Sequence, residues 1–254
     1  MSLTEQIFYL TIFILYCLVG ILIINKAYKG KKSNVVYLGI NIITNGIIYF
    51  LVFLSFSWLQ YVLRDVGLIF ALIFTKLTFY QDKKGPFLGF LIFTIVSGVI
   101  QSLFSIIGFF LITDISIIFL FLYIADVFFA ITVMISSCWF AYAAFEAYNG
   151  IKSYDLEPFQ KKRYLIFGVS GILIAFDGFL FFVFMPAMMN YILGLIIQFM
   201  IAGLIFIFIV LNYLVWVAPK FYRDFLNKGY VSSSGKEEEL SEEELMKKLS
   251  AGDK

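Results

Sequence analysis

The chain has 254 residues, of which 62% are hydrophobic, 20% are aromatic and only 14% are charged, with a formal net charge of +2. Soluble domains are about half apolar and about a quarter charged, so this composition excludes an ordinary soluble protein. The sequence contains no histidine, and its two cysteines, Cys17 and Cys138, lie in separate apolar runs. It therefore offers neither the ligands of a structural zinc site nor a disulfide framework, and we expect no metal and no cofactor.

Long apolar stretches recur along the whole chain, and roughly 20 helical residues cross a hydrocarbon core about 30 Å thick. They predict an all-α, polytopic membrane protein with a bundle of seven transmembrane helices. The predicted spans are residues 7–24, 35–56, 60–80, 87–112, 115–148, 164–185 and 191–217. The opening residues MSLTEQ lack a basic cluster, so the first span is interpreted as a retained helix rather than a signal peptide.

The third predicted span is the weakest of the seven. It fits a membrane only if Arg64 and Lys76 extend their charged ends toward the two surfaces, and without it six spans remain. Capping patterns support other boundaries, because Asp114 is placed to cap the span that begins at residue 115.

Basic residues predict the orientation of the bundle, because lysine and arginine in short loops favour the cytoplasmic side. One side of the predicted bundle carries thirteen basic residues and the other carries Arg64 alone. The thirteen are Lys26, Lys29, Lys31, Lys32, Lys83, Lys84, Lys152, Lys161, Lys162, Arg163, Lys220, Arg223 and Lys228. We therefore expect the protein to lie in the cell membrane, with its N-terminus outside and its C-terminus in the cytoplasm. This orientation requires an odd number of spans.

Two short segments follow the predicted bundle of residues 1–217. Residues 218–229 predict an amphipathic helix on the inner leaflet, with aromatic and leucine side chains on one face. Residues 230–254 predict a charged, flexible tail with a short helix that begins at a capping box formed by Ser241 and Glu244. Two interpretations of these segments are possible. They form an interfacial anchor and a solvated tail, or residues 218–254 bind a cytoplasmic protein partner.

Polar side chains inside the apolar spans are the candidate functional residues, because such positions are costly in lipid and usually face the bundle interior. The segment FLYIADVFFAI at 121–131 places Asp126 in an apolar run, and Asp177 occupies a similar position in the sixth span. Counting from the span ends puts both acids near the middle of the bilayer, where we expect no lysine or arginine to pair with them. The full candidate set for a ligand site or ion path is Asp126, Asp177, Gln101, Asn45, Asn41 and Gln198.

Small and polar residues also recur at helical spacing and predict the contact faces between helices. The fourth span has one stripe of this kind, and the sixth span has a stripe of small residues that permits close helix contact. The stripes are Thr94, Gly98, Gln101, Ser105 and Gly108, and Gly168, Gly171, Ala175 and Gly178.

The expected layout resembles that of rhodopsins and of seven-helix receptors, in architecture alone. A retinal-binding lysine is missing from residues 191–217, and the sequences TKLTFYQ and VLNYLVWVAP, which end the third and seventh spans, lack the receptor motifs. No specific family is indicated.

Three hypotheses about function follow. The first is a sensor or receptor-like protein that binds a small or lipidic ligand in the bundle and signals to a cytoplasmic partner. The second is a small transporter or a proton- or cation-conducting protein that uses Asp126 and Asp177, and the third is a membrane scaffold or accessory subunit without a ligand. We expect neither an enzyme nor a nucleic-acid-binding protein, because catalytic and phosphate-binding motifs are missing and the basic loops follow from membrane topology.

Overall fold

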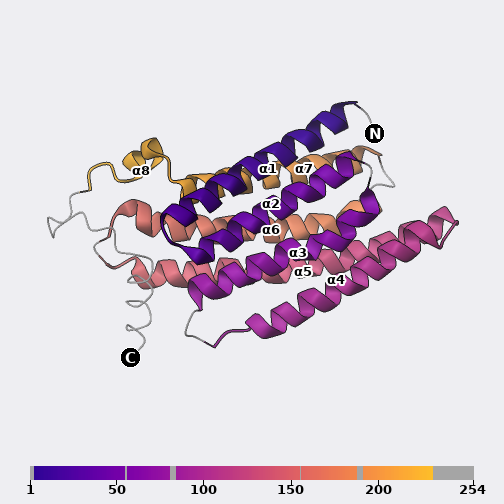
Figure 1. Ribbon diagram of the computed structural model, residues 1–254, viewed down its shortest axis with the longest axis horizontal. Helices are drawn as coiled ribbons and strands as arrows, with labels where there is room; N and C mark the ends of the chain where they lie inside the picture. The colour runs from indigo at the N-terminus through magenta and orange to yellow at the C-terminus, as the bar shows by residue number, and fades with distance from the viewer. Residues whose placement is uncertain (1–2, 55, 81–83, 155, 188–190, 231–254) are drawn as a thin grey trace.

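The computed structural model describes residues 3–54, 56–80, 84–154, 156–187 and 191–230, and its regular structure is helical. Seven long helices run roughly along one axis, and a short helix lies at one end of the bundle (Figure 1). The elements are α1 (Leu3–Lys29), α2 (Ser33–Phe53), α3 (Ser57–Phe79), α4 (Phe87–Phe110), α5 (Ile115–Ile151), α6 (Pro158–Ala187), α7 (Tyr191–Asn212), the π-helical turn η1 (Tyr213–Val217) and α8 (Lys220–Leu226).

Six of the long helices are long and apolar enough to cross a membrane, and α3 is the exception. α3 has 23 residues, which is sufficient length, but it contains Arg64, Asp65 and Lys76. The chain is thus an all-α, multi-pass membrane protein. Each of the seven predicted spans corresponds to a helix, although α1 and α6 begin about one turn or more before the predicted spans.

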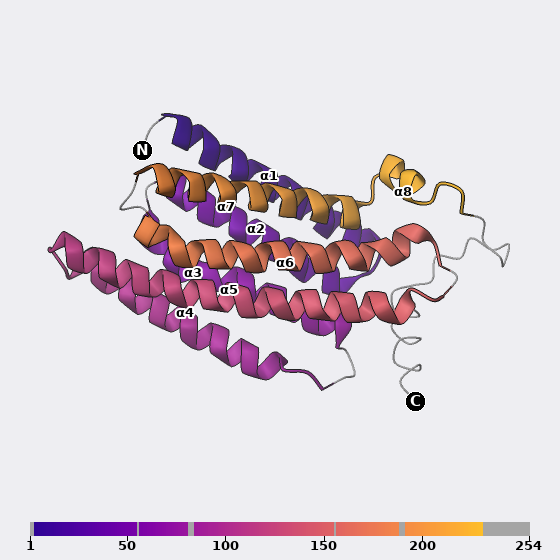
Figure 2. The ribbon, with the colours of Figure 1, turned by 180° about the vertical axis from the view of Figure 1, so that it is seen from behind.

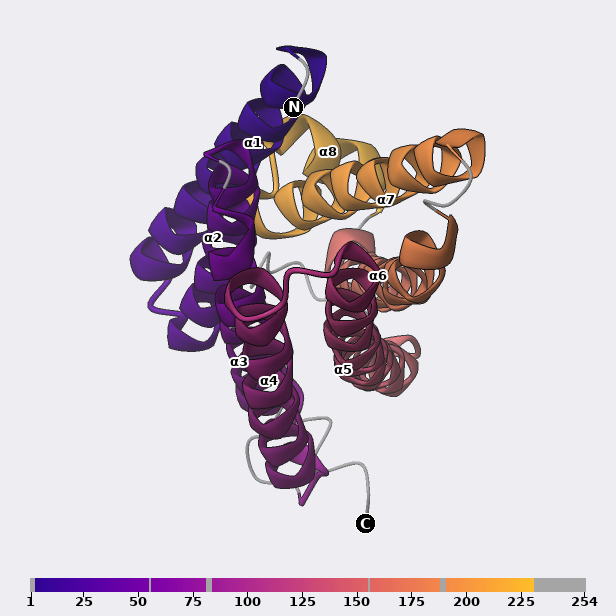
Figure 3. The ribbon, with the colours of Figure 1, turned by 90° about the vertical axis from the view of Figure 1, so that its right-hand side faces the viewer.

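The long helices form a ring that is closed by contact between α7 and α1 (Figure 3). Each long helix packs against the next one along the chain, and α3 also packs directly against α5. α4 therefore lies on the outer side of the α3–α5 contact, at the edge of the bundle (Figure 2). The ends of α1, α3 and α5, which carry basic residues, lie at the same end of the molecule as α8 (Figure 1).

The predicted contact faces of the fourth and sixth spans are confirmed as buried seams. On α4, Thr94, Gln101 and Ser105 are at most 1% exposed. On α6, a Cβ atom at Gly178 would lie 2.9 Å from the Met134 side chain and 3.1 Å from a backbone oxygen of α5. Small residues therefore set the distance between α5 and α6.

A second close contact, between α1 and α2, involves two glycines outside the predicted stripes. A Cβ atom at Gly39 would lie 3.0 Å from the carbonyl oxygen of Gly20 and would overlap the side chain of Ile24. A Cβ atom at Gly20 would lie 2.9 Å from the carbonyl oxygen of Gly39. The two backbones approach each other here because neither residue has a side chain.

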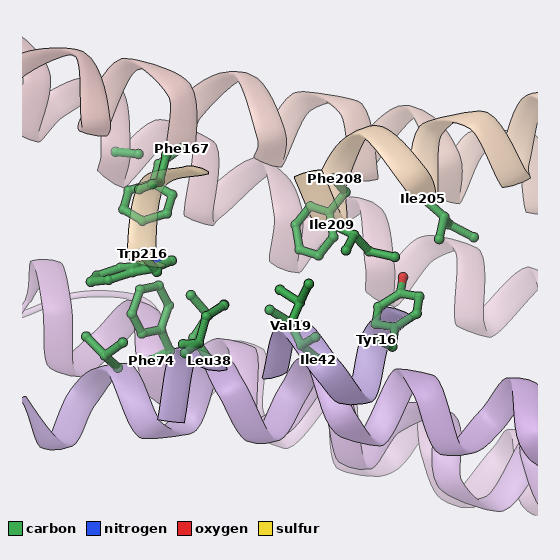
Figure 4. Close-up of a cluster of buried hydrophobic side chains, with 14 of the residues drawn as sticks. Tyr16, Val19, Leu38, Ile42, Phe74, Phe167, Ile205, Phe208, Ile209 and Trp216 are labelled. Atoms are coloured by element: carbon green, nitrogen blue, oxygen red, sulfur yellow. The ribbon is translucent and has the colours of Figure 1, made fainter. Parts of the chain in front are cut away.

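Aromatic side chains fill the core near the end that carries α8. Figure 4 shows Phe74 of α3, Trp216 of η1 and Phe167 of α6 in a column. Phe74 and Trp216 meet edge to face with ring centroids 5.7 Å apart, and the Phe167 and Trp216 rings are tilted, with centroids 4.9 Å apart. The guanidinium of Arg163 lies 4.1 Å from the centroid of the Trp216 ring. The column joins α3, α6 and the end of α7, and the cationic group adds an attraction to the face of the indole.

A polar cluster attaches α8 to the beginning of α6. Arg223 donates to both carboxylate oxygens of Glu157, at 3.0 and 3.1 Å, and the amide nitrogen of Asn227 donates to the same carboxylate at 3.0 Å. The side-chain oxygen of Asn227 accepts from the backbone nitrogen of Phe159 at 2.9 Å, and the Phe159 and Tyr222 rings meet edge to face. The predicted helix within 218–229 is present, whereas the predicted tail helix lies in 231–254, outside the described residues.

The α1–α2 contact generates a testable prediction. We expect Gly39→Ala to lower the free energy of unfolding by about 1–3 kcal/mol, because the added methyl group meets backbone that cannot move without separating the helices. Thermal unfolding in detergent micelles, followed by tryptophan fluorescence, measures the change.

The matched control is Gly203→Ala on α7, where an added Cβ atom has no neighbour within 4 Å. This variant should be as stable as the wild type or slightly more stable, since alanine favours helix over glycine. Equal stability of the two variants would contradict the close contact between α1 and α2.

Candidate functional site: a cavity inside the helical ring

The ring encloses a cavity with a volume of about 310 Å³. α1, α2, α3, α5, α6 and α7 contribute its lining residues, and α4 contributes none of them. Most of the lining is apolar or aromatic, and a small number of polar side chains point into it. An apolar cavity with a few polar groups is the usual form of a small-molecule site.

Five of the six candidate residues line this cavity: Asp126, Asp177, Asn41, Asn45 and Gln198. They come from four helices and are far apart in sequence, so the fold brings them together. Gln101 is not among the lining residues. Its side chain is fully buried in the α4 seam, where its amide nitrogen donates to Ser97 Oγ at 3.1 Å.

The central polar interaction of the cavity is an ion pair between Arg64 of α3 and Asp126 of α5. An Nη1 hydrogen of Arg64 is donated to Oδ1 of Asp126, and both residues are buried, with 8% and 4% exposure. Two expectations are therefore wrong. Arg64 does not extend toward the membrane surface, and Asp126 does have a basic partner inside the bundle.

Aromatic rings surround the Arg64 guanidinium. Its central carbon lies 4.2 Å from the centroid of the Tyr61 ring, 4.7 Å from that of Phe129 and 5.9 Å from that of Phe181. Burial of an ion pair costs several kcal/mol of desolvation for each ion, and contacts with ring faces together with the ion pair itself offset part of this cost. The position of Arg64 explains why α3 can lie inside the bundle despite its charge.

Asp177 of α6 is the second acid of the cavity, and its environment differs from that of Asp126. It is 5% exposed, and its Oδ1 atom is buried with no hydrogen-bond partner among the described residues. Tyr16 of α1 and Tyr49 of α2 lie close enough to interact with it electrostatically, and their rings stack with centroids 5.8 Å apart. Among the described residues that line the cavity, one acid thus has a basic partner and the other has none.

The amide side chains that line the cavity form hydrogen bonds with each other or with neighbouring groups. Asn45 donates to the backbone and side-chain oxygens of Asn41, both at 2.9 Å. Gln198 of α7 donates to the Tyr9 hydroxyl at 3.4 Å, which links α7 to the neighbouring α1. These contacts hold the amides on the cavity wall.

Sequence reasoning missed two charged residues of α3. Arg64 was interpreted as a surface residue, although an arginine within a span together with an acid on another helix is a recognisable signal of a buried pair. Asp65 is also buried, with 4% exposure, and faces α4, where a Cβ atom at Gly98 would lie 3.1 Å from its carboxyl group. The glycine in the α4 stripe therefore makes room for a charged side chain of α3.

No protein-family model, no curated protein and no solved structure matches the chain. Within the described ranges, no group of three or more His, Cys, Asp or Glu residues is arranged to hold a metal ion. The functional assignment therefore depends on the cavity itself.

The buried ion pair generates a second testable prediction. We expect Asp126→Asn to lower the free energy of unfolding by about 3–5 kcal/mol, because it leaves the Arg64 charge buried without its partner. The melting temperature in detergent micelles measures the loss.

The double variant Arg64→Met with Asp126→Leu is the matched comparison. Because it removes both charges and keeps similar volumes, it should be more stable than Asp126→Asn alone. An Asp126→Asn protein with the stability of the wild type would show that the pair does not form.

Proposed function

We propose that the protein is a receptor-like membrane protein whose helical ring binds a small or lipid-derived amphipathic ligand. The observation that carries the proposal is the cavity of about 310 Å³ with an apolar, aromatic lining and polar groups from five different helices. Small-molecule sites have volumes of roughly 300–1,000 Å³, a mostly apolar lining and a few polar groups that orient the ligand.

The proposal includes a seventh transmembrane span formed by α3. Three features support it: the length of α3, its position between α2, α4 and α5, and the burial of Arg64 and Asp65 against protein rather than lipid. With seven spans, the thirteen basic residues of the predicted inner side fall on the side of α8. The positive-inside rule then places the N-terminus outside the cell and α8 in the cytoplasm.

The receptor-like part of the proposal concerns the route from the cavity to α8. Phe74 lines the cavity and contacts Trp216 edge to face, and Trp216 lies in the π-helical turn directly before α8. On α8 itself, Phe221 and Phe225 are 69% and 71% exposed. We propose that these two rings insert into the inner leaflet and that the segment 218–254 contacts a cytoplasmic protein partner.

The two other hypotheses receive less support. A two-acid ion path requires Asp126 to be available, and Arg64 occupies its carboxylate. A scaffold without a ligand would have no use for an internal cavity with unpaired polar atoms. Packed protein interiors contain few voids larger than a water molecule, so the cavity favours a ligand-binding role.

A cavity-filling substitution tests ligand binding. We expect wild-type protein in detergent micelles to bind the neutral probe 4-phenylbutan-1-ol and Ala202→Phe to lose this binding, because Ala202 lines the cavity and a phenyl ring would fill it. Isothermal titration calorimetry with the purified full chain measures the affinity.

The matched control is Gly203→Phe, which adds the same ring to the adjacent residue on the exposed face of α7. This variant should bind the probe as the wild type does. Equal binding by all three proteins would locate the probe outside the cavity and contradict the proposed function.

Accessibility of single cysteines tests the seventh span. In a chain with Cys17→Ser and Cys138→Ser, we expect Phe56→Cys before α3 to react with a membrane-impermeant maleimide in intact cells. Lys84→Cys after α3 should react only after permeabilisation, since a helix that spans the membrane separates the two positions. Labelling of both positions in intact cells would mean that α3 does not cross the membrane.

A further inference from the structure

The cavity is lined by more acidic groups than basic ones. Its lining contains one basic side chain, Arg64, and two carboxylic acids, Asp126 and Asp177. Arg64 is paired with Asp126, and rings of Tyr61 and Phe129 cover its guanidinium at 4.2 and 4.7 Å. The ion pair is therefore complete, and one carboxyl group is left over.

The remaining carboxyl group belongs to Asp177, which is buried and has no basic partner among the described residues. Its Oδ1 atom has no hydrogen-bond partner among the described residues, although more than nine-tenths of the residue is buried. A buried carboxylate without a partner costs far more than a paired one, because it loses its hydration and receives no opposite charge in return. A cationic group inside the cavity would remove this cost, whereas an anionic group would add repulsion.

The groups around Asp177 suit the same kind of ligand. Tyr16 and Tyr49 lie near its carboxyl group, and Tyr9 stacks against Tyr49 with ring centroids 6.3 Å apart. Tyrosine rings attract cations to their faces, and hydroxyl oxygens accept hydrogen bonds from an ammonium group. Further along the cavity, the lining includes Phe74 and Phe208, which would contact an apolar body.

We propose that the cavity is a site for an amine, in which Asp177 is the counter-ion of a protonated amino group and the aromatic walls hold an aryl or alkyl portion of the same molecule. This inference rests on the proposed ligand-binding function and specifies the class of ligand. The Arg64–Asp126 pair does not bind the amine in this arrangement; it holds α3 against α5 and keeps the arginine from attracting an anion.

Three probes of the same shape and different charge test the inference. They are 4-phenylbutylamine, 4-phenylbutan-1-ol and 4-phenylbutanoate, titrated into the purified full chain in detergent micelles. We expect the wild type to bind the amine about tenfold or more tightly than the alcohol, because a charged pair in a desolvated site is worth more than a neutral hydrogen bond, and to bind the carboxylate most weakly.

Substitution of Asp177 should abolish the preference. We expect Asp177→Asn to bind the amine no better than the alcohol and to keep its affinity for the alcohol, which also demonstrates that the variant is folded. Asp177→Glu retains the charge and should retain a preference for the amine. Asp114→Asn, which removes a carboxylate from the exposed cap of α5, should behave as the wild type and thus control for a general change in charge.

The outcomes separate this inference from the proposed function. Suppose that the alcohol binds and that Ala202→Phe abolishes this binding. If the wild type then shows no preference for the amine, or if Asp177→Asn keeps that preference, the assignment of an amine ligand is wrong. The proposed ligand-binding cavity is still supported in that case. If none of the three probes binds in a manner that depends on Ala202, both fail.

Discussion

The buried ion pair between Arg64 and Asp126 is the interaction on which the architecture depends. Without it, α3 would carry an uncompensated cation into the middle of an apolar bundle, at a cost that exceeds the gain from most helix contacts. With it, α3 packs directly on α5 and α4 is left on the outer side of that contact. The wall of the cavity on this side therefore consists of α3 and α5.

The same ion pair determines the electrostatic character of the cavity. A free arginine in an aromatic site would favour anionic ligands, and a free aspartate would favour cationic ones. Because Arg64 and Asp126 neutralise each other and aromatic rings cover the guanidinium, Asp177 is the lining acid left without a basic partner among the described residues. In the proposed function, the ion pair stabilises the bundle and Asp177 recognises the ligand.

Much of the fold follows from the sequence, because apolar length and loop charge are strong signals in membrane proteins. The helices, the α4 and α6 seams and the capping of α5 by Asp114 were predictable, and the Asp114 side chain indeed accepts from the backbone nitrogens of Ser116 and Ile117. The sequence predicted that Asp126, Asp177 and Asn45 lie at a similar depth in the bilayer. It did not show that their side chains line the same cavity. Which helices lie next to one another cannot be deduced from spans of such similar composition.

The errors have a common physical cause. Arg64 was assigned to the surface because a cation near a span end usually extends toward water, and Gln101 was assigned to the site because depth alone does not specify the direction of a side chain. The end of the α4–α5 pair opposite α8 also projects beyond the neighbouring helices (Figure 1), so a residue count from the start of α5 is not a count from a common surface. The pairing between helices, rather than position along one helix, decides where a polar residue is stable.

The contact between Asn227 and Phe159 has a consequence for the order in which the molecule is completed. The first turn of α6 has a backbone donor whose acceptor is a side chain 68 residues later in the chain. During synthesis, that acceptor leaves the ribosome only after α7 has been made, so α6 inserts with an open N-terminal donor and receives its cap from Asn227, the residue after α8. Any shortened form of the protein that ends before Asn227 would keep that donor exposed and would also lose the amide contact to Glu157.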